Sequence, residues 1–298
     1  MILPSLTNSL SLQHHASIFL NLYFGKRVAQ LALKDLIQAG LHFGHAATSW
    51  NPKMAPFLFG IRKKVHIFDL KQTAKSLVAG SHLAKEVSLR GKKVMFVGTK
   101  VQAQQAIREA AQATGSYYVC ERWLGGMLTN HSVILRRLDR LAELERIAQE
   151  ETRNYSKKVL ASFKREQKKL TRDLGGVRGM ENLPDLVVVV DPNHEHTAVK
   201  EANICGIPVI ALTDSNCDPT PVDLVIPGND DAKRGIKLVL DSIVASIVAG
   251  QKEFEEKDAA PESESEPVEA AAPAEVEEAA APVEAEEKKE EASAEVQA

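Results

Sequence analysis

The sequence predicts an α/β fold, in which a parallel sheet carries helices on both faces and a helical hairpin is inserted into the sheet domain. Short runs of Val, Ile and Leu alternate with helical patterns along most of the chain. These runs lack the polar alternation of a half-exposed strand, which is typical of strands buried on both faces. A long charged segment with helical periodicity interrupts the alternation between residues 129 and 177.

The elements of the sheet domain follow from these runs. The expected strands are 65–70 (VHIFDL), 92–98, 116–120, 185–191, 207–212 and 222–228, and the expected helices are 71–90, 101–114, 196–206 and 230–250. Gly206 stands directly after one helical pattern, where a glycine commonly ends a helix. Strands that alternate with helices predict crossover connections and therefore a parallel sheet.

The interruption predicts two helices. Residues 132–150 place Ile134, Leu138 and Leu141 on one stripe, and residues 155–174 carry a similar apolar stripe. Each helix would be roughly 27–30 Å long, and the short polar link between them favours an antiparallel hairpin. Residues 153–173 hold eight Lys or Arg and two acidic residues, so we expect this helix to contact a polyanion.

Charge divides the rest of the chain. The whole chain has a net charge of −3, but residues 251–298 alone carry 17 acidic and four basic residues, so residues 1–250 have a net charge of +10. The Ala/Glu-rich tail is typical of disorder. Segment 1–27 has no acidic residue and no clear signal-peptide pattern, which suggests a disordered extension or a mis-assigned start. The predicted domains are a sheet domain (28–128 and 178–250), a hairpin (129–177) and the tail (251–298).

The sequence contains no recognisable catalytic, cofactor-binding or metal-binding motif. The three cysteines, Cys120, Cys205 and Cys217, have no paired spacing, which argues against disulfides and zinc and fits a reducing cytosol. No loop has the glycine spacing of a phosphate cradle, and no apolar run is long enough to cross a membrane. The segment Asp191–His196 offers carboxylates and imidazoles without convergent spacing. We therefore predict no catalytic, cofactor or metal site and no small-molecule substrate.

Residues 39–64 combine glycine, histidine, aromatic and basic residues. Gly40 and Gly44 flank the histidines, so His42, Gly44 and His45 are interpreted as a structural turn. Aromatic and basic side chains in a proline-containing loop are typical of RNA binding, because bases stack and phosphates attract cations. The predicted RNA-binding residues here are Trp50, Asn51, Lys53, Arg62, Lys63 and Lys64, and those of the hairpin are Arg136, Arg137, Lys157, Lys158, Lys164, Arg165, Lys168 and Lys169.

Several ordered blocks resemble one family. They are AGLHFGHAATSWNPKMAPFLFG, VHIFDLKQT, VMFVGTK, RWLGGMLTN, LPDLVVVVDPNHEHTAVKEANICGIPVIALTDSNCDP and VDLVIPGNDDAKRGI, and they cover about residues 33–250. In this respect the chain is similar to the bacterial-type small-subunit ribosomal protein two. The resemblance implies a flavodoxin-like three-layer fold with an inserted coiled-coil hairpin. It also implies a structural, non-catalytic role in the bacterial cytoplasm, as a ribosome-bound protein.

The implied partners are small-subunit ribosomal RNA, ribosomal protein one and other small-subunit proteins. A rival hypothesis is a flavodoxin-like enzyme for a small molecule, with His42, His45 and the Asp191–His196 loop gathered at the carboxyl ends of the strands. That hypothesis predicts a bound cofactor or a stoichiometric metal.

Overall fold

The structure is a computed structural model that describes residues 33–149 and 155–259, with side chains to residue 256. These residues belong to one compact unit. The expectations for segment 1–27 and for most of the acidic tail lie outside the described residues. No helix in the described ranges is both long and apolar enough to span a membrane.

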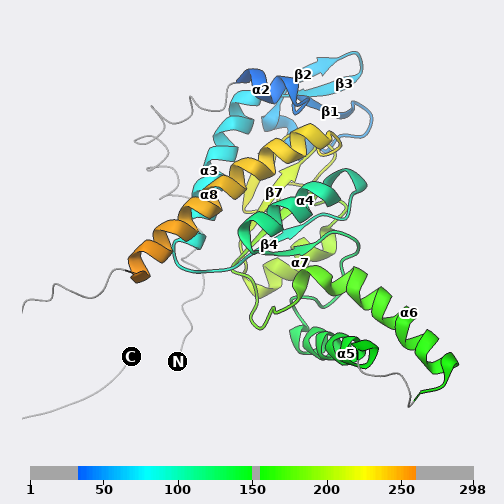
Figure 1. Cartoon of the computed structure of the whole chain (residues 1–298). Helices are drawn as coiled ribbons and strands as arrows, with labels where there is room; N and C mark the ends of the chain where they lie inside the picture. Colours follow the sequence, from blue (N-terminus) through cyan, green and yellow to red (C-terminus); the bar gives the residue numbers. More distant parts are fainter. Residues whose placement is uncertain (1–32, 150–154, 260–298) are drawn as a thin grey trace, which may run out of the picture. The chain divides into compact units, whose positions relative to one another are not determined.

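The sheet domain is built on five parallel strands (Figure 1). Their order across the sheet is β5 (Tyr117–Val119), β4 (Val94–Val97), β6 (Leu186–Val190), β7 (Val209–Thr213) and β8 (Leu224–Pro227). Every neighbouring pair is parallel. In chain order this is 2-1-3-4-5, the arrangement of flavodoxin-like sheets. The predicted α/β class with a parallel sheet is therefore confirmed.

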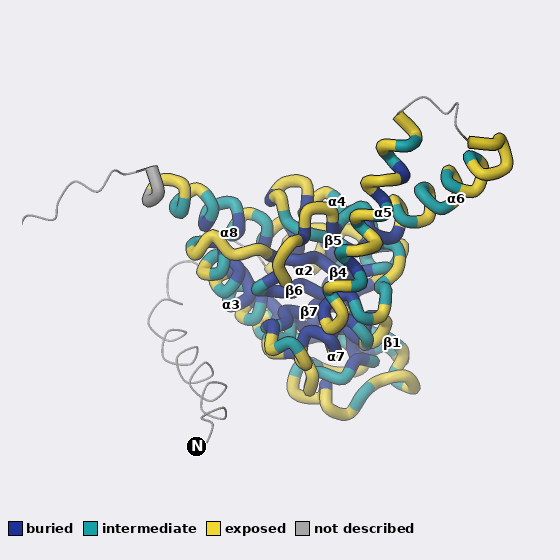
Figure 2. The backbone as a smooth tube through the Cα atoms, turned by 90° about the horizontal axis from the view of Figure 1, so that it is seen from below, coloured by how far each residue is buried: buried dark blue, intermediate teal, exposed yellow. Residues whose placement is uncertain are grey.

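Helices cover both faces of this sheet, as expected for strands without polar alternation. Side chains that alternate along β4 and β6 point to opposite faces, so that Val94 and Phe96 pack on one side and Met95 and Val97 on the other. The first side is covered by α3 (Leu70–Ser88), α4 (Val101–Thr114) and α8 (Lys233–Ala259), and the second by α7 (His196–Cys205) and by buried residues between Met127 and Met180. Figure 2 shows β4, β6 and β7 buried between these layers.

One expected strand belongs to a different sheet. Residues 65–70 were predicted to join the parallel sheet, but β3 (Val65–Phe68) is the centre of a small antiparallel sheet with the order β1-β3-β2. Its neighbours β1 (Phe43–Ala46) and β2 (Leu58–Arg62) were not predicted. A parallel partner would need a long crossover, whereas β2 and β3 are joined directly by a two-residue turn. The strand itself was therefore predicted, but its assignment to the parallel sheet was wrong.

The last helix is longer than predicted. The helix was expected to end at Gly250, but α8 continues to Ala259. A Cβ atom on Gly250 would lie 2.7 Å from the carbonyl oxygen of Lys85, so this glycine allows α3 and α8 to approach closely. Lys85 also pairs with Glu253 beyond it. The residues from 251 to 259, which were assigned to the tail, are therefore helical.

The remaining elements connect these layers. Short helices lie at α2 (Leu33–Gln38), η2 (Pro52–Phe57) and η4 (Gly175–Val177), and the long charged segment forms α5 (His131–Gln149) and α6 (Lys157–Leu174). Gly206 ends α7 with a φ of 70°, as predicted for a left-handed cap. A Cβ atom on Gly176 would overlap the carbonyl oxygen of Tyr118, so the backbone at η4 packs directly against β5.

Candidate nucleic-acid interface

The turn between β2 and β3 places three cations at the end of the small sheet. Arg62 pairs with Val65, so Lys63 and Lys64 alone form the loop, and all three basic side chains are exposed. Lys63 has a φ of 51° and Lys64 a φ of 64°. Positive φ at both central residues is the geometry of a type I′ hairpin, which normally selects Asn or Gly. We call Arg62, Lys63 and Lys64 the basic tip.

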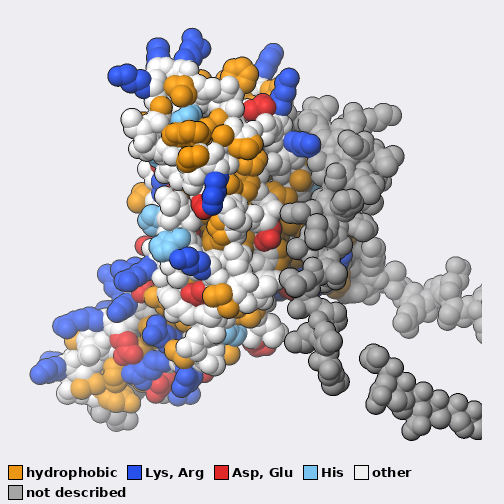
Figure 3. Space-filling model, turned by 180° about the vertical axis from the view of Figure 1, so that it is seen from behind, with side chains coloured by type: hydrophobic (Ala, Val, Ile, Leu, Met, Phe, Trp, Pro, Cys, Tyr) orange, Lys and Arg blue, Asp and Glu red, His pale blue; other side chains and the backbone are white. Residues whose placement is uncertain are grey.

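Apolar side chains lie beside the basic tip. Phe59 and Ile61 alternate on β2 and are 81% and 62% exposed, and β2 is an edge strand. Figure 3 shows hydrophobic side chains over this sheet with Lys and Arg above them. Trp50 is partly exposed, and its ring lies 5.0 Å from that of His66. Sequence reasoning missed Phe59 and Ile61, although their two-residue spacing before three basic residues was the available signal.

Asn51 and Lys53 have internal roles. The side chain of Asn51 accepts a hydrogen bond from the backbone N–H of Lys53 and caps η2. Lys53 Nζ lies 2.8 Å from Asp218 Oδ2 and donates to Thr220 Oγ1 at 2.9 Å. The Lys53 ammonium and Thr220 lower the pKa of Asp218 to about 2. Asn51 therefore caps η2, and Lys53 connects η2 to the loop after β7.

A second set of cations lies along α6. The six predicted residues of this helix are all exposed, and no ion pair within the described residues involves any of them: Lys157, Lys158, Lys164, Arg165, Lys168 and Lys169. The two acidic residues of α6 are paired instead, Glu166 with Arg140 at 3.2 Å and Asp173 with Arg172 at 2.8 Å. The uncompensated charge of the helix is therefore positive.

The base of α6 holds a pocket of about 460 Å³ between α5, α6 and the loop before them. Its charged lining consists of Arg122, Arg137, Arg140, Lys169, Arg172, Glu166 and Asp173. Five cations against two carboxylates, both of them already paired with arginines, give a cavity suited to a phosphate group. Figure 3 shows Lys and Arg gathered over this end of the molecule.

Contacts between α5 and α6 come from both polar and aromatic groups. Arg140 lies 5.5 Å from the ring centroid of Phe163, which in turn lies 5.5 Å from the ring of Tyr155. Ile134, Leu141 and Leu144 of α5 are buried. The link 150–154 lies outside the described residues.

The loop that leads into α5 is held by one buried carboxylate. Glu201 on α7 is 6% exposed and accepts hydrogen bonds from Trp123 Nε1 and from the backbone N–H groups of Gly126, Leu128 and Thr129. Burial opposes its charge, but these donors outweigh burial and lower its pKa. Glu201 was not predicted from the sequence, because its partners are more than 70 residues away in the chain.

The predicted turn at His42, Gly44 and His45 is only partly present in the structure. His42 lies in a turn, whereas Gly44 and His45 belong to β1, which corrects that prediction. A Cβ atom on Gly44 would lie 3.0 Å from Ser215 Oγ, so glycine lets β1 approach the end of β7. The backbone N–H of His45 donates to Asp214 Oδ1 and Ser215 Oγ, which attaches the small sheet to the parallel sheet.

Charged side chains pair with one another at the crevice where flavodoxin-like sheets bind ligands. It lies between the carboxyl ends of β4 and β6, where the strand order reverses. There Glu195 accepts hydrogen bonds from the N–H and hydroxyl of Thr99, and Lys100 Nζ lies 2.7 Å from Asp230 and 3.5 Å from Asp191. Negative charge at this position disfavours a phosphate-bearing cofactor.

Comparison with known proteins assigns the family. Residues 36–250 match the family model described as ribosomal protein S2. The chain belongs to the ribosomal protein S2 family. It is 46% identical over 225 residues to the small ribosomal subunit protein uS2 of Oleidesulfovibrio alaskensis, which covers 75% of this chain and 86% of that protein. It is 45% identical over 250 residues to the uS2 protein of Nitratidesulfovibrio vulgaris, which covers 83% and 91%.

Membership of the ribosomal protein S2 family confirms the resemblance that the sequence blocks indicated. Ribosomal protein S2 is a structural component of the ribosome and not an enzyme, so the rival hypothesis of a small-molecule enzyme is not supported.

Proposed function

We propose that this protein is a structural constituent of the small ribosomal subunit and binds ribosomal RNA through two basic surfaces, the basic tip and α6. The observation that carries the proposal is the membership of the ribosomal protein S2 family across residues 36–250. The exposed cations of α6 support it, since they have no acidic partners among the described residues and are therefore available to phosphates. The expected location is the bacterial cytoplasm, bound to the ribosome.

In this proposal α5 and α6 form an antiparallel coiled-coil hairpin inserted in the sheet domain. The Arg140–Glu166 ion pair and the contact between Arg140 and Phe163 support this pairing of the helices. The buried side of α5 faces the core while the basic side of α6 faces solvent. Such a hairpin extends the reach of the positive charge well beyond the sheet.

At the small sheet, the basic tip contacts phosphates, and Trp50 with the exposed Phe59 offers aromatic surface to unstacked bases. Asn51 and Lys53 contribute by positioning, because both are held in contacts with neighbouring segments. Arg136 and Arg137 are exposed on α5 near the pocket at the base of α6 and contact phosphates there.

The experiment compares two matched double variants in binding to small-subunit ribosomal RNA. Lys164→Ala with Lys168→Ala removes two charges one turn apart on α6, and Lys71→Ala with Lys75→Ala does the same on α3. We expect the α6 variant to bind more weakly and the α3 variant to bind as the unchanged protein does. Equal binding by all three proteins would contradict the role of α6.

Salt dependence gives a second readout. Each lost phosphate contact should lower the slope of log affinity against log salt concentration by roughly 0.7 to 0.9. The α6 double variant should therefore lose roughly 1.4 to 1.8 from that slope, since two contacts are removed. A protein that does not co-sediment with small subunits in a low-salt sucrose gradient would contradict the proposed function as a whole.

We also propose that the bound protein helps recruit ribosomal protein one. Small subunits isolated from cells depleted of this protein should carry less ribosomal protein one, and adding the protein back should restore it. If the amount of ribosomal protein one did not depend on this protein, recruitment would be excluded while the RNA-binding role would stand.

A further inference from the structure

The pocket at the base of α6 holds more positive charge than its own acidic side chains balance. It has a volume of about 460 Å³, and its lining includes five cations and two carboxylates, which leaves an excess of three positive charges. Glu121, which is next to Arg122 in the chain, does not reduce this excess because it pairs with Arg108. We call this cavity the basic pocket.

Two of the five cations are held in place by the two carboxylates. Arg140 is fully engaged, since its Nε and Nη2 lie 3.2 and 3.4 Å from Glu166 and its Nη1 lies 2.8 Å from Glu143. Arg172 uses only its Nε, which donates to Asp173 at 2.8 Å. Asp173 is only 8% exposed, so it orients the Arg172 guanidinium and leaves both terminal nitrogens without a partner among the described residues.

The other three cations have no ion pair with any described residue. They are Arg122 in the loop before α5, Arg137 on α5 and Lys169 on α6. Like charges that three separate elements bring to one cavity repel one another, and a bound anion removes this repulsion. Guanidinium groups also fit phosphate oxygens with two parallel hydrogen bonds, which favours phosphate over a simple halide ion.

We propose that the basic pocket binds the pyrophosphate group of a free nucleoside diphosphate. The excess of three positive charges selects this group. Each phosphodiester of RNA carries one negative charge, a phosphate monoester carries about 1.5 to 2 at pH 7, and a diphosphate carries one more, roughly 2.5 to 3. The diphosphate therefore matches the charge of the pocket within a single compact group.

The size and the apolar wall of the pocket fit the rest of the nucleotide. Its volume lies within the range of roughly 300–1,000 Å³ that is typical of small-molecule sites. Leu124 and Leu170 line it beside the cations and pack against the core, so they provide a fixed apolar surface for the nucleoside. No glycine-rich loop indicated this site in the sequence, because its cations are spread between positions 122 and 172.

A nucleotide in the basic pocket would regulate the RNA-binding surface, and this step rests on the proposed function. Arg137 and Lys169 are among the residues that we propose contact RNA, and both line the pocket. The nucleotide and RNA then compete for the same two cations. The site differs from the crevice of the parallel sheet, where Asp191 and Asp230 disfavour phosphate.

The test is isothermal titration of the purified full chain with adenosine diphosphate, without magnesium, at a salt concentration of about 0.15 M. The site variant is Arg122→Gln with Lys169→Gln. The matched control is Lys157→Gln with Lys158→Gln, which removes the same charge at the other end of α6, outside the pocket. All four side chains are exposed, so both variants should fold.

We expect the unchanged protein and the control to bind one adenosine diphosphate per chain, and the site variant to bind it at least ten-fold more weakly. Equal binding by the two variants would overturn the site. Adenosine monophosphate should bind the unchanged protein at least ten-fold more weakly than the diphosphate, and equal affinity would overturn the choice of the pyrophosphate group.

A competition arm separates this inference from the proposed function. Adenosine diphosphate should displace a fragment of small-subunit ribosomal RNA from the unchanged protein, and failure to displace it would overturn the regulatory step. A protein that bound the RNA but not the diphosphate would overturn the nucleotide site while the proposed function stood. Binding of the diphosphate without RNA binding would support the site and contradict the proposed function.

Discussion

Replacing Glu201 by glutamine tests whether one buried carboxylate holds the loop before α5 in place. Glu201 Oε1 accepts from Trp123 Nε1 at 3.1 Å and from the N–H of Gly126 at 2.8 Å, and Oε2 accepts from the N–H groups of Leu128 and Thr129 at 3.0 and 3.3 Å. The glutamine side chain would keep one oxygen, but its NH₂ group would face two N–H donors.

The cost follows from those two donors. A buried N–H group that loses its acceptor costs about 1–3 kcal/mol, and the Thr129 hydroxyl can recover part of this by turning to accept from the new amide. We therefore expect Glu201→Gln to lower the free energy of unfolding by about 3 kcal/mol. Glu201→Ala should cost more, because it removes every one of these hydrogen bonds and leaves a cavity.

Urea unfolding followed by circular dichroism measures the effect, and tryptophan fluorescence reports the surroundings of Trp123 directly. The pKa of Glu201 is lowered in the folded protein, so its contribution is present above the unfolded value of 4.5 and is lost as the pH falls through the folded pKa. The gap between the two proteins should narrow below about pH 4.5. Glu86→Gln, at an exposed site, is the control.

A Glu201→Gln protein within about 0.5 kcal/mol of the unchanged protein would refute this reasoning, because a surface substitution has an effect of that size. A loss that persisted undiminished at about pH 3 would also refute it, since Glu201 would then stabilise the fold without its charge.

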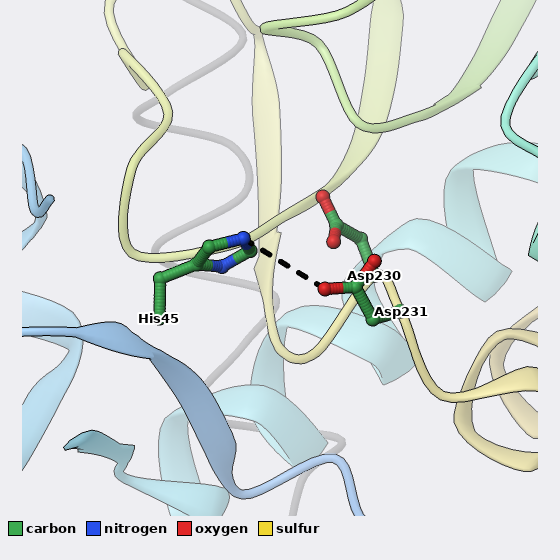
Figure 4. A group of neighbouring side chains, drawn as sticks. All are labelled: His45, Asp230 and Asp231. Carbon is green, nitrogen blue, oxygen red and sulfur yellow. Dashed lines mark ion pairs between the residues drawn. The ribbon is translucent and has the colours of Figure 1, made fainter.

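Three further predictions concern other parts of the fold. Lys64→Gly should raise the free energy of unfolding by about 1 kcal/mol in urea titrations and weaken RNA binding, because it relieves a left-handed φ and removes a charge; lower stability would contradict the strain. Gly176→Ala should cost about 3 kcal/mol because its Cβ would meet a backbone carbonyl, while Gly175→Ala, where nothing lies within 4 Å, should be neutral by the same measurement. Burial and Asp191 raise the pKa of Asp230 from 3.8 to about 7, and the carboxylates of Asp214, Asp230 and Asp231 outweigh the burial of His45 and raise its pKa above 6.5; Figure 4 shows Asp230 and Asp231 facing its ring. The folded state then binds more protons than the unfolded state, so the melting temperature should fall between about pH 5.5 and 7.5; a rise would refute these shifts.

The parallel sheet could be predicted because its signal is local. Strands such as Leu186–Val190 are buried on both faces and therefore consist of uninterrupted apolar residues. The exposed strands among the described residues do not have this pattern. The helices between them follow from the same alternation. The strand order across the sheet, by contrast, could not be predicted from these runs, because an apolar run does not indicate which strand it will pair with.

The small sheet and the contacts around it could not be predicted from local patterns. The strand Phe43–Ala46 has only four residues and contains a glycine, so its sequence resembles that of a turn. It is stabilised by contacts with residues distant in the sequence, such as Asp214, which no local pattern indicates. The basic tip contains no Asn or Gly to indicate its turn type, although both its central residues have positive φ. The exposed cations themselves could be predicted, because the charge of a side chain follows from its residue type, whereas the pairing of strands does not.

The two surfaces that we propose bind RNA, the basic tip and α6, lie far apart on one folded unit, as Figures 1 and 3 both show. Two separated contact surfaces on one body raise the effective concentration of the second surface once the first has bound. Each surface can then be weak by itself and dissociate within milliseconds, while the pair remains attached for far longer. This gain depends on the stiffness of the protein between the two surfaces. A substitution that loosens the attachment of β1 to β7 should therefore shorten the residence time on RNA without touching a single cation.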